Sequence, residues 1–163
     1  MTTGQSLLTC RRGAAAAEMA LVLPFLVVLL FGSVDLGYYF YNQHQVVKGV
    51  RDGARFASRQ SFTAISCNGT TIPGEVETAI KNVTRTGRIS GGSARVPGWI
   101  NDDITVSVTC PTTPLTSGIY KNETNAPQIN IVATVDHNAL FAGLVLDSPL
   151  RLNANQQAAV MGI

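Results

Sequence analysis

The stretch AAAAEMALVLPFLVVLLFGSV, residues 14–34, decides the fold of this 163-residue chain. Its 21 residues include a single charged one, Glu18. As an α-helix the stretch is about 31 Å long, which matches the hydrocarbon core of a lipid bilayer. We therefore expect residues 14–34 to form a transmembrane helix.

The residues before this stretch predict its orientation. A short polar leader, residues 1–13, has Arg11 and Arg12 as its only charged residues. Positive charges beside an apolar span hold that end in the cytoplasm, so the chain from Asp35 onward is expected outside. An ordinary secretory signal peptide is disfavoured, because no pair of small residues stands one and three positions before a cut beyond the span. A plain single-span anchor remains, or an anchor with a further role.

The composition of the whole chain excludes several classes of protein. Charged residues make up 13% and apolar residues 45%, which excludes an intrinsically disordered protein. A net charge of +2, with scattered Lys and Arg, indicates no nucleic-acid partner. His44 and His137 are the only histidines and lie far apart, so we expect no metal site built on histidine and no cofactor. The sequence has no HExxH, GxSxG, P-loop or CxxC motif, and we expect no enzymatic activity.

Glu18 is the residue that favours a further role for the anchor. A carboxylate about 6 Å inside the start of a transmembrane helix costs free energy in lipid, and such an acid points to function when a partner can be named. A cut after Gly13 would supply that partner, because Ala14 would then carry a free amine one helical turn from Glu18. Among staggered parallel helices, the carboxylate of one subunit can pair with the amine of its neighbour and favour one axial register. The alternative is that Glu18 only reaches to the cytoplasmic headgroups.

The order of motifs over residues 11–59 resembles that of TadE-like proteins, the pseudopilins of tight-adherence (Tad/Flp) pilus systems. These motifs are Arg12-Gly13, four small residues, Glu18, Leu23-Pro24, Gly37-Tyr38-Tyr39 and the segment RDGAR at residues 51–55. One departure is Met19, where related proteins often have Phe or Tyr.

The resemblance implies a site, partners and a location. A prepilin peptidase would recognise Arg12 and Gly13 and cut before Ala14, and Glu18 would set the register between subunits. The partners would be other pilins and pseudopilins of the same system and the inner-membrane assembly platform. The protein would lie in the bacterial inner membrane as a minor structural component that acts in pilus assembly, with its outer domain periplasmic or extracellular. The implied fold is pilin-like.

The helical pattern continues beyond the span. Residues 35–59 have apolar positions mostly at three- and four-residue steps, which predicts one helix from about Ala14 to about Ser58. Gly49 and Gly53 lie four apart and would let another helix or the protein's own sheet approach closely. Four cations on a neighbouring face form either a solvated surface or a contact with a neighbouring subunit: Lys48, Arg51, Arg55 and Arg59.

Residues 60–163 are expected to form a small α+β domain. Residues 74–86 have apolar positions on one helical face, and three later runs alternate as half-buried antiparallel strands do. These runs are residues 103–110, 128–136 and 150–160. Residues 138–145 are expected to form a short apolar turn or helix. The predicted fold class is α+β, a long helix packed on a small antiparallel sheet.

The cysteines and a few acids complete the predictions. Cys67 and Cys110 lie outside the membrane, where a disulfide is permitted, and the alternative is that Cys110 is a buried apolar thiol. Cys10 lies in the leader, on the reducing side. The pair Asp102-Asp103 is expected at a turn, with a calcium site as a weaker option. The pair Asp136-His137 is expected on the surface.

Two functions from different classes fit these features. The first is the minor pseudopilin, which needs the cut at Gly13 and the carboxylate of Glu18. The second is a single-pass anchored domain that stays a monomer and binds an external ligand, which needs neither.

Overall fold

The structure is a computed structural model, and it describes residues 11–67, 72–110, 118–121, 126–141 and 150–162. In chain order its elements are α1 (Arg11–Ser58), α2 (Gly74–Thr86), η1 (Asn101–Asp103), β1 (Ile104–Thr109), η2 (Gly118–Tyr120), β2 (Gln128–His137) and β3 (Leu150–Ala159).

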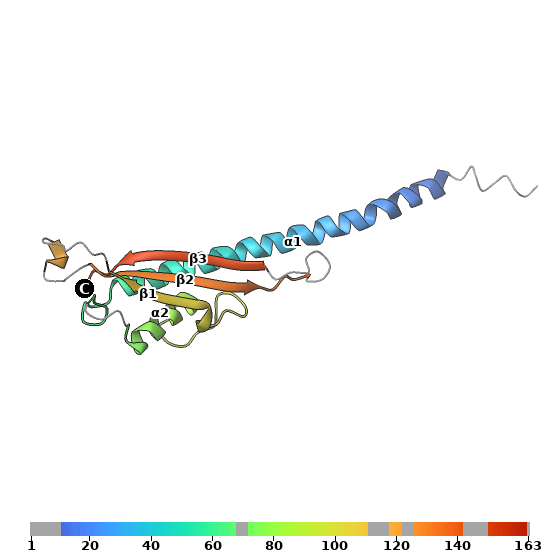
Figure 1. Cartoon of the computed structure of the whole chain (residues 1–163). Coiled ribbons are helices and arrows are strands. Elements are labelled where there is room, and N and C mark those ends of the chain that lie inside the picture. The colour runs from blue at the N-terminus through green and yellow to red at the C-terminus, as the bar shows by residue number, and fades with distance from the viewer. Residues whose placement is uncertain (1–10, 68–71, 111–117, 122–125, 142–149, 163) are drawn as a thin grey trace, which may run out of the picture.

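The long helix α1 forms the axis of the molecule, and the rest of the described chain covers mainly its second half (Figure 1). It has 48 residues and begins three residues before the predicted start. Its second half has an apolar stripe at three- and four-residue steps, and this stripe is buried. The buried residues of the stripe are Val46, Val50, Ala54 and Ala57.

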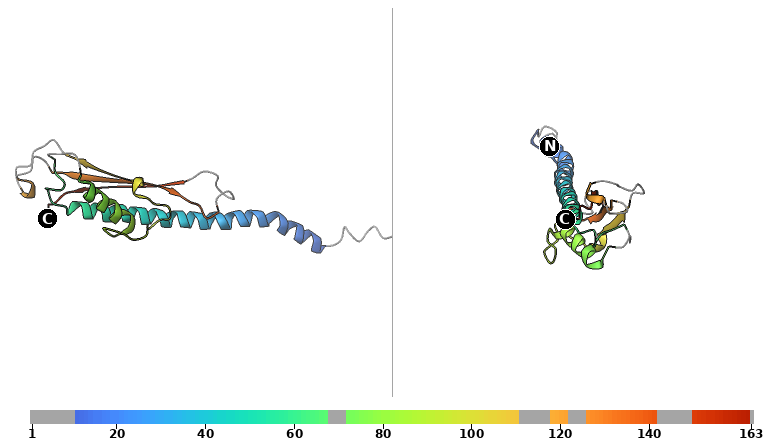
Figure 2. Two further views of the ribbon diagram at one scale, coloured as in Figure 1. Left: turned by 90° about the horizontal axis from the view of Figure 1, so that it is seen from below. Right: turned by 90° about the vertical axis from the view of Figure 1, so that its left-hand side faces the viewer.

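The sheet is antiparallel and has the order β1-β2-β3, so each strand lies beside its neighbour in sequence. In the central strand β2 the alternate residues Ile129, Ile131, Ala133 and Val135 are buried, while the residues between them face outward. The buried face lies against α1, and α2 packs beside α1. Figure 2 shows α1 running along the sheet and projecting beyond it. The predicted α+β class is therefore confirmed.

The element boundaries differ slightly from the prediction. Helix α2 has the predicted bounds. β1 begins at Ile104, because the preceding residues Asn101–Asp103 form a 3-10 turn, and it ends at Thr109, one residue before the disulfide-bonded Cys110. β2 continues to His137, and β3 ends at Ala159. Of the predicted turn over residues 138–145, residues 142–145 lie outside the described part of the chain.

A disulfide joins Cys67 to Cys110 with a Cα–Cα distance of 5.8 Å. It ties the segment that follows α1 to the end of β1, at the end of the domain away from the apolar half of α1 (Figure 1). Loop-closure entropy for a separation of 43 residues corresponds to about 4 kcal/mol of stabilisation. The alternative of a free buried thiol at Cys110 is therefore wrong. Cys10 lies outside the described residues.

Candidate functional site

The first turns of α1 contain the residues that the sequence predicts to be cut and paired. The helix begins at Arg11 and continues through Arg12, Gly13 and Ala14. Gly13 is exposed, and a side chain built there would meet nothing within 4 Å. The cut after Gly13 and the orientation set by the two arginines stay predictions.

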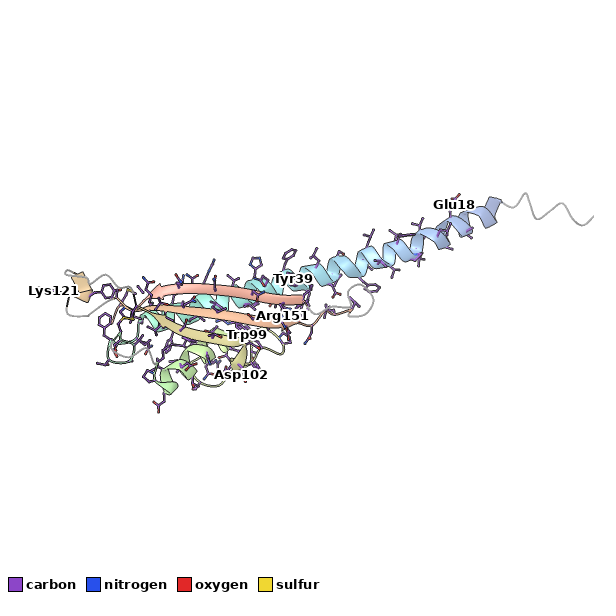
Figure 3. All side chains as sticks on the ribbon, in the orientation of Figure 1. Glu18, Tyr39, Trp99, Asp102, Lys121 and Arg151 are labelled. Atoms are coloured by element: carbon purple, nitrogen blue, oxygen red, sulfur yellow. A yellow bond between two sulfur atoms is a disulfide. The ribbon has the colours of Figure 1, made fainter. Side chains whose placement is uncertain are left out.

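Glu18 lies on α1 four residues after Ala14, about 6 Å along the helix axis (Figure 3). Its side chain is exposed. The ion pairs among the described side chains are Lys81–Glu77, Arg95–Asp52 and Arg151–Asp136, so none of them includes Glu18. The register role of Glu18 stays a prediction that needs a second molecule.

The apolar half of α1 is long and apolar enough to cross a membrane. The candidate span Ala15–Ser58 contains an 18-residue window with a mean hydropathy of 2.4, of which 6% is buried. The core helix of a soluble protein would be mostly buried instead. The large exposed apolar side chains of this half are Met19, Leu21, Val22, Leu23, Phe25, Leu26, Val28, Leu29, Leu30 and Val34.

Asp35 lies where the apolar half of α1 meets the domain, and it is buried with 6% of its surface exposed. Its carboxylate accepts a hydrogen bond from the backbone N–H of Leu140 at 2.8 Å and a longer one, at 3.3 Å, from that of Phe141. One turn earlier on α1, the Phe31 ring lies 4.4 Å from the Phe141 ring, centroid to centroid. The residues that follow β2 are thereby fixed to the helix at this junction.

His137 is buried beside the same junction, which corrects the predicted surface pair. It is 4% exposed, and its ring lies 5.5 Å from the Tyr38 ring and 5.3 Å from the Tyr39 ring. Because β2 extends one residue further than predicted, His137 falls on the same face as the buried residues of that strand. Asp136 alone is on the surface, and it pairs across the sheet with Arg151 at 3.3 Å.

Gly49 and Gly53 allow α2 to approach α1 closely. A Cβ on Gly49 would overlap the carbonyl oxygen of Thr84 and the ring of Trp99, and a Cβ on Gly53 would overlap the Thr84 hydroxyl. Thr84 is fully buried, and its hydroxyl donates to the carbonyl of Ile80 at 2.8 Å. The close approach predicted at these glycines is therefore made by a helix of the same chain.

The charged face of α1 is only partly used within the chain. Asp52 accepts a hydrogen bond from Arg95 at 2.7 Å, which fixes the loop after α2 to α1. The four cations of the predicted face are all exposed: Lys48, Arg51, Arg55 and Arg59. An open hollow of about 420 Å³ lies beside the first three of them, Lys48, Arg51 and Arg55, and is lined also by His44, Val47 and Asp52. Solvated surface and subunit contact both remain open for this face.

The described residues include no group of three or more His, Cys, Asp or Glu that could hold a metal ion. Asp103 acts as a turn residue, as predicted, since its carboxylate accepts a hydrogen bond from the backbone N–H of Ile100 at 2.9 Å. Nothing in this part of the chain adds support for the weaker calcium option.

Sequence reasoning missed two residues that organise the domain. Asp35 is the only acid between Glu18 and Asp52, and its place directly after the apolar stretch could have marked it as a boundary residue. Trp99 is the only tryptophan and is 1% exposed, packed against Gly49. A lone tryptophan in a glycine-rich loop gives no periodic signal, so only the structure reveals its role.

The comparisons with known proteins agree with this picture over α1. A family model described as TadE, a TadE-like protein, matches residues 13–55. The matched segment begins at Gly13 and ends with the RDGAR motif, so it lies within α1 and confirms the resemblance there. No curated protein and no solved structure gives a significant match.

Proposed function

We propose that this chain is a minor pseudopilin-like component that acts in the assembly of a Tad/Flp-type pilus, held in the bacterial inner membrane by α1. The match of residues 13–55 to the TadE-like family carries this proposal. Two features of the structure support it: the apolar half of α1 projects alone from the domain, and Glu18 is exposed in that half.

In this proposal the N-terminal end of α1 is cleaved before assembly. A prepilin peptidase recognises Arg12 and Gly13 and cuts before Ala14. The new amine of Ala14 pairs with Glu18 of a neighbouring subunit, because a charge left unpaired in lipid penalises every other axial register. The outer domain then contacts pilins or sister pseudopilins, and the apolar half of α1 contacts their helices and the assembly platform. The role is structural and needs no catalytic residue.

The N-terminus of the protein purified from membranes of its native host tests the processing step. Intact-mass measurement should give a chain that begins at Ala14. A chain that keeps Arg11 and Arg12 would contradict the proposal and favour the alternative, an anchored monomeric domain that binds an external ligand.

Two variants separate processing from assembly. Gly13→Val should block the cut by its bulk at the cut site, and it should leave the fold intact because the space around Gly13 is open. Glu18→Ala should be cut normally but should be incorporated poorly into the pilus machinery. Glu75→Ala, which removes an exposed acid from α2, is the matched control and should change neither step. Normal piliation with Glu18→Ala would rule out the register role, and mature protein from Gly13→Val would rule out the cut site.

A further inference from the structure

β2 ends and β3 begins at the end of the sheet that is nearer to the apolar half of α1 (Figure 1). β2 ends at His137, and residues 138–141, here called the junction loop, turn against α1. The loop is held there by the hydrogen bonds to Asp35 and by the ring contact with Phe31.

The ring contact places the junction loop at the level of the membrane boundary. Phe31 lies three residues before the end of the apolar stretch 14–34, about 4–5 Å inside it along the helix axis. The Phe141 ring lies 4.4 Å from the Phe31 ring. If α1 spans a bilayer with this stretch in the hydrocarbon core, Phe141 lies at the edge of that core.

Exposed apolar side chains lie at this level and on the next turns of α1. Leu140 is 54% exposed beside Phe141, and Leu36 and Phe40 of α1 are exposed to a similar degree. Exposed apolar surface is unfavourable in water and favourable against lipid, because it is then removed from water. These side chains therefore fit the outer boundary of a membrane.

The polar groups of the junction loop are satisfied in a way that suits a membrane boundary. A carboxylate or a backbone N–H without a partner costs several kcal/mol in lipid. Asp35 and the N–H groups of Leu140 and Phe141 satisfy each other, and Asp35 is buried beneath the loop. The two loop amides can thus leave water without losing hydrogen bonds.

We propose that the junction loop inserts Leu140 and Phe141 into the lipid interface beside α1, as a second membrane contact of the outer domain. This inference rests on the membrane anchoring in the proposed function, and on none of the pilus partners. The second contact fixes both the height of the domain above the bilayer and its rotation about the helix axis, which a single helix leaves free.

Nitroxide labels on the full chain test this contact. The chain carries Cys10→Ser, so that the added cysteine is the only free thiol, and is reconstituted in vesicles of phosphatidylcholine and phosphatidylglycerol. Labels are placed by Leu140→Cys in the loop, by Phe25→Cys in the apolar half of α1 and by Ile100→Cys in the outer domain. Ile100 is the matched control: it is 53% exposed, and its neighbour Trp99 packs on Gly49, about 22 Å beyond Val34 along the helix.

The readout compares collisions of each label with oxygen, which concentrates in lipid, and with a water-soluble nickel chelate. We expect the oxygen-to-nickel ratio at position 140 to be several-fold higher than at position 100 and lower than at position 25. Equal ratios at 140 and 100, with a lipid-like ratio at 25, would overturn the inference and leave the anchoring intact. A water-like ratio at position 25 would overturn the anchoring and the inference together.

Discussion

The two halves of α1 are both rich in apolar residues, yet they meet different surroundings. In the inner half, which is the apolar half described above (residues 15–34), Leu21 and Phe25 are each 72% exposed. In the outer half, residues 35–58, Val46 and Val50 are buried against the rest of the chain. The inner half is apolar all round, whereas the outer half has one apolar stripe, so only the outer half can be covered by a sheet on one side. The pattern around the helix therefore decides what covers each half.

The acids of α1 show the same difference. Asp35 accepts two loop amides and Asp52 pairs with Arg95, so both are satisfied within the chain. Glu18 of the inner half is exposed and takes part in none of the ion pairs among the described side chains. The outer half finds its partners within its own chain, and we infer that the partners of the inner half are lipid and other subunits.

Removing the disulfide should have the largest effect on the outer half. In the double variant Cys67→Ser, Cys110→Ser, the free energy of unfolding of the outer domain should fall by about 4 kcal/mol, because the unfolded chain gains the entropy of an open loop. Trp99 is buried and is the only tryptophan, so its fluorescence during a urea titration in detergent reports this unfolding directly. The helix content of the inner half should survive. An unchanged urea midpoint would mean that the disulfide does not hold the domain together.

Adding a side chain at the contact between α1 and α2 should cause the next largest loss in the free energy of unfolding. In Gly53→Val, the added side chain would overlap the Thr84 hydroxyl, and overpacking of this kind costs about 1–3 kcal/mol. Gly37→Val is the control, since the same change meets nothing within 4 Å there. The difference between the two urea midpoints then measures packing, because the gain in helix propensity is the same in both. Equal midpoints would show that α2 does not need the glycine.

Releasing the junction loop should have a smaller effect. Asp35→Ala removes the acceptor of the Leu140 and Phe141 amides, and the expected loss is about 1 kcal/mol, the low end for unpaired groups, because an opened loop regains water. Hydrogen exchange of these two amides should become faster. Asp136→Ala breaks an exposed ion pair with Arg151 and should change stability by less. Slow exchange that persists in Asp35→Ala would show that Asp35 does not hold the loop.

Most of the fold could be predicted from the sequence, because it rests on periodic patterns. The apolar stretch, the three- and four-residue steps after it and the alternation in three later runs predict α1, α2 and the strands within a few residues. The boundary errors have local causes. The turn at Asn101–Asp103 shortens the start of β1, and the extra residue of β2 turns His137 inward.

The site could be predicted only where its residues lie close together in sequence. Gly13, Ala14 and Glu18 lie within six consecutive residues and belong to one familiar motif, and the family match begins at the first of them. Asp35 and Phe141 are more than 100 residues apart, and nothing local in either indicates their contact. Their meeting depends on the length of the β2–β3 hairpin relative to the outer half of α1, which only the assembled structure defines.

Glu18→Gln should have the smallest effect on stability and separates the two halves most sharply. The side chain is exposed, so the free energy of unfolding should change by no more than about 0.5 kcal/mol. The urea titration followed by Trp99 fluorescence measures this change. The corresponding change of acid to amide at Asp35, Asp35→Asn, removes the charge that accepts hydrogen bonds from two loop amides. It should therefore shift the urea midpoint further. A variant that folds normally but is lost from the assembly would place the partner of Glu18 in another molecule. A Glu18→Gln shift as large as that of Asp35→Asn would instead make Glu18 part of the fold, and the two halves of α1 would no longer differ in kind.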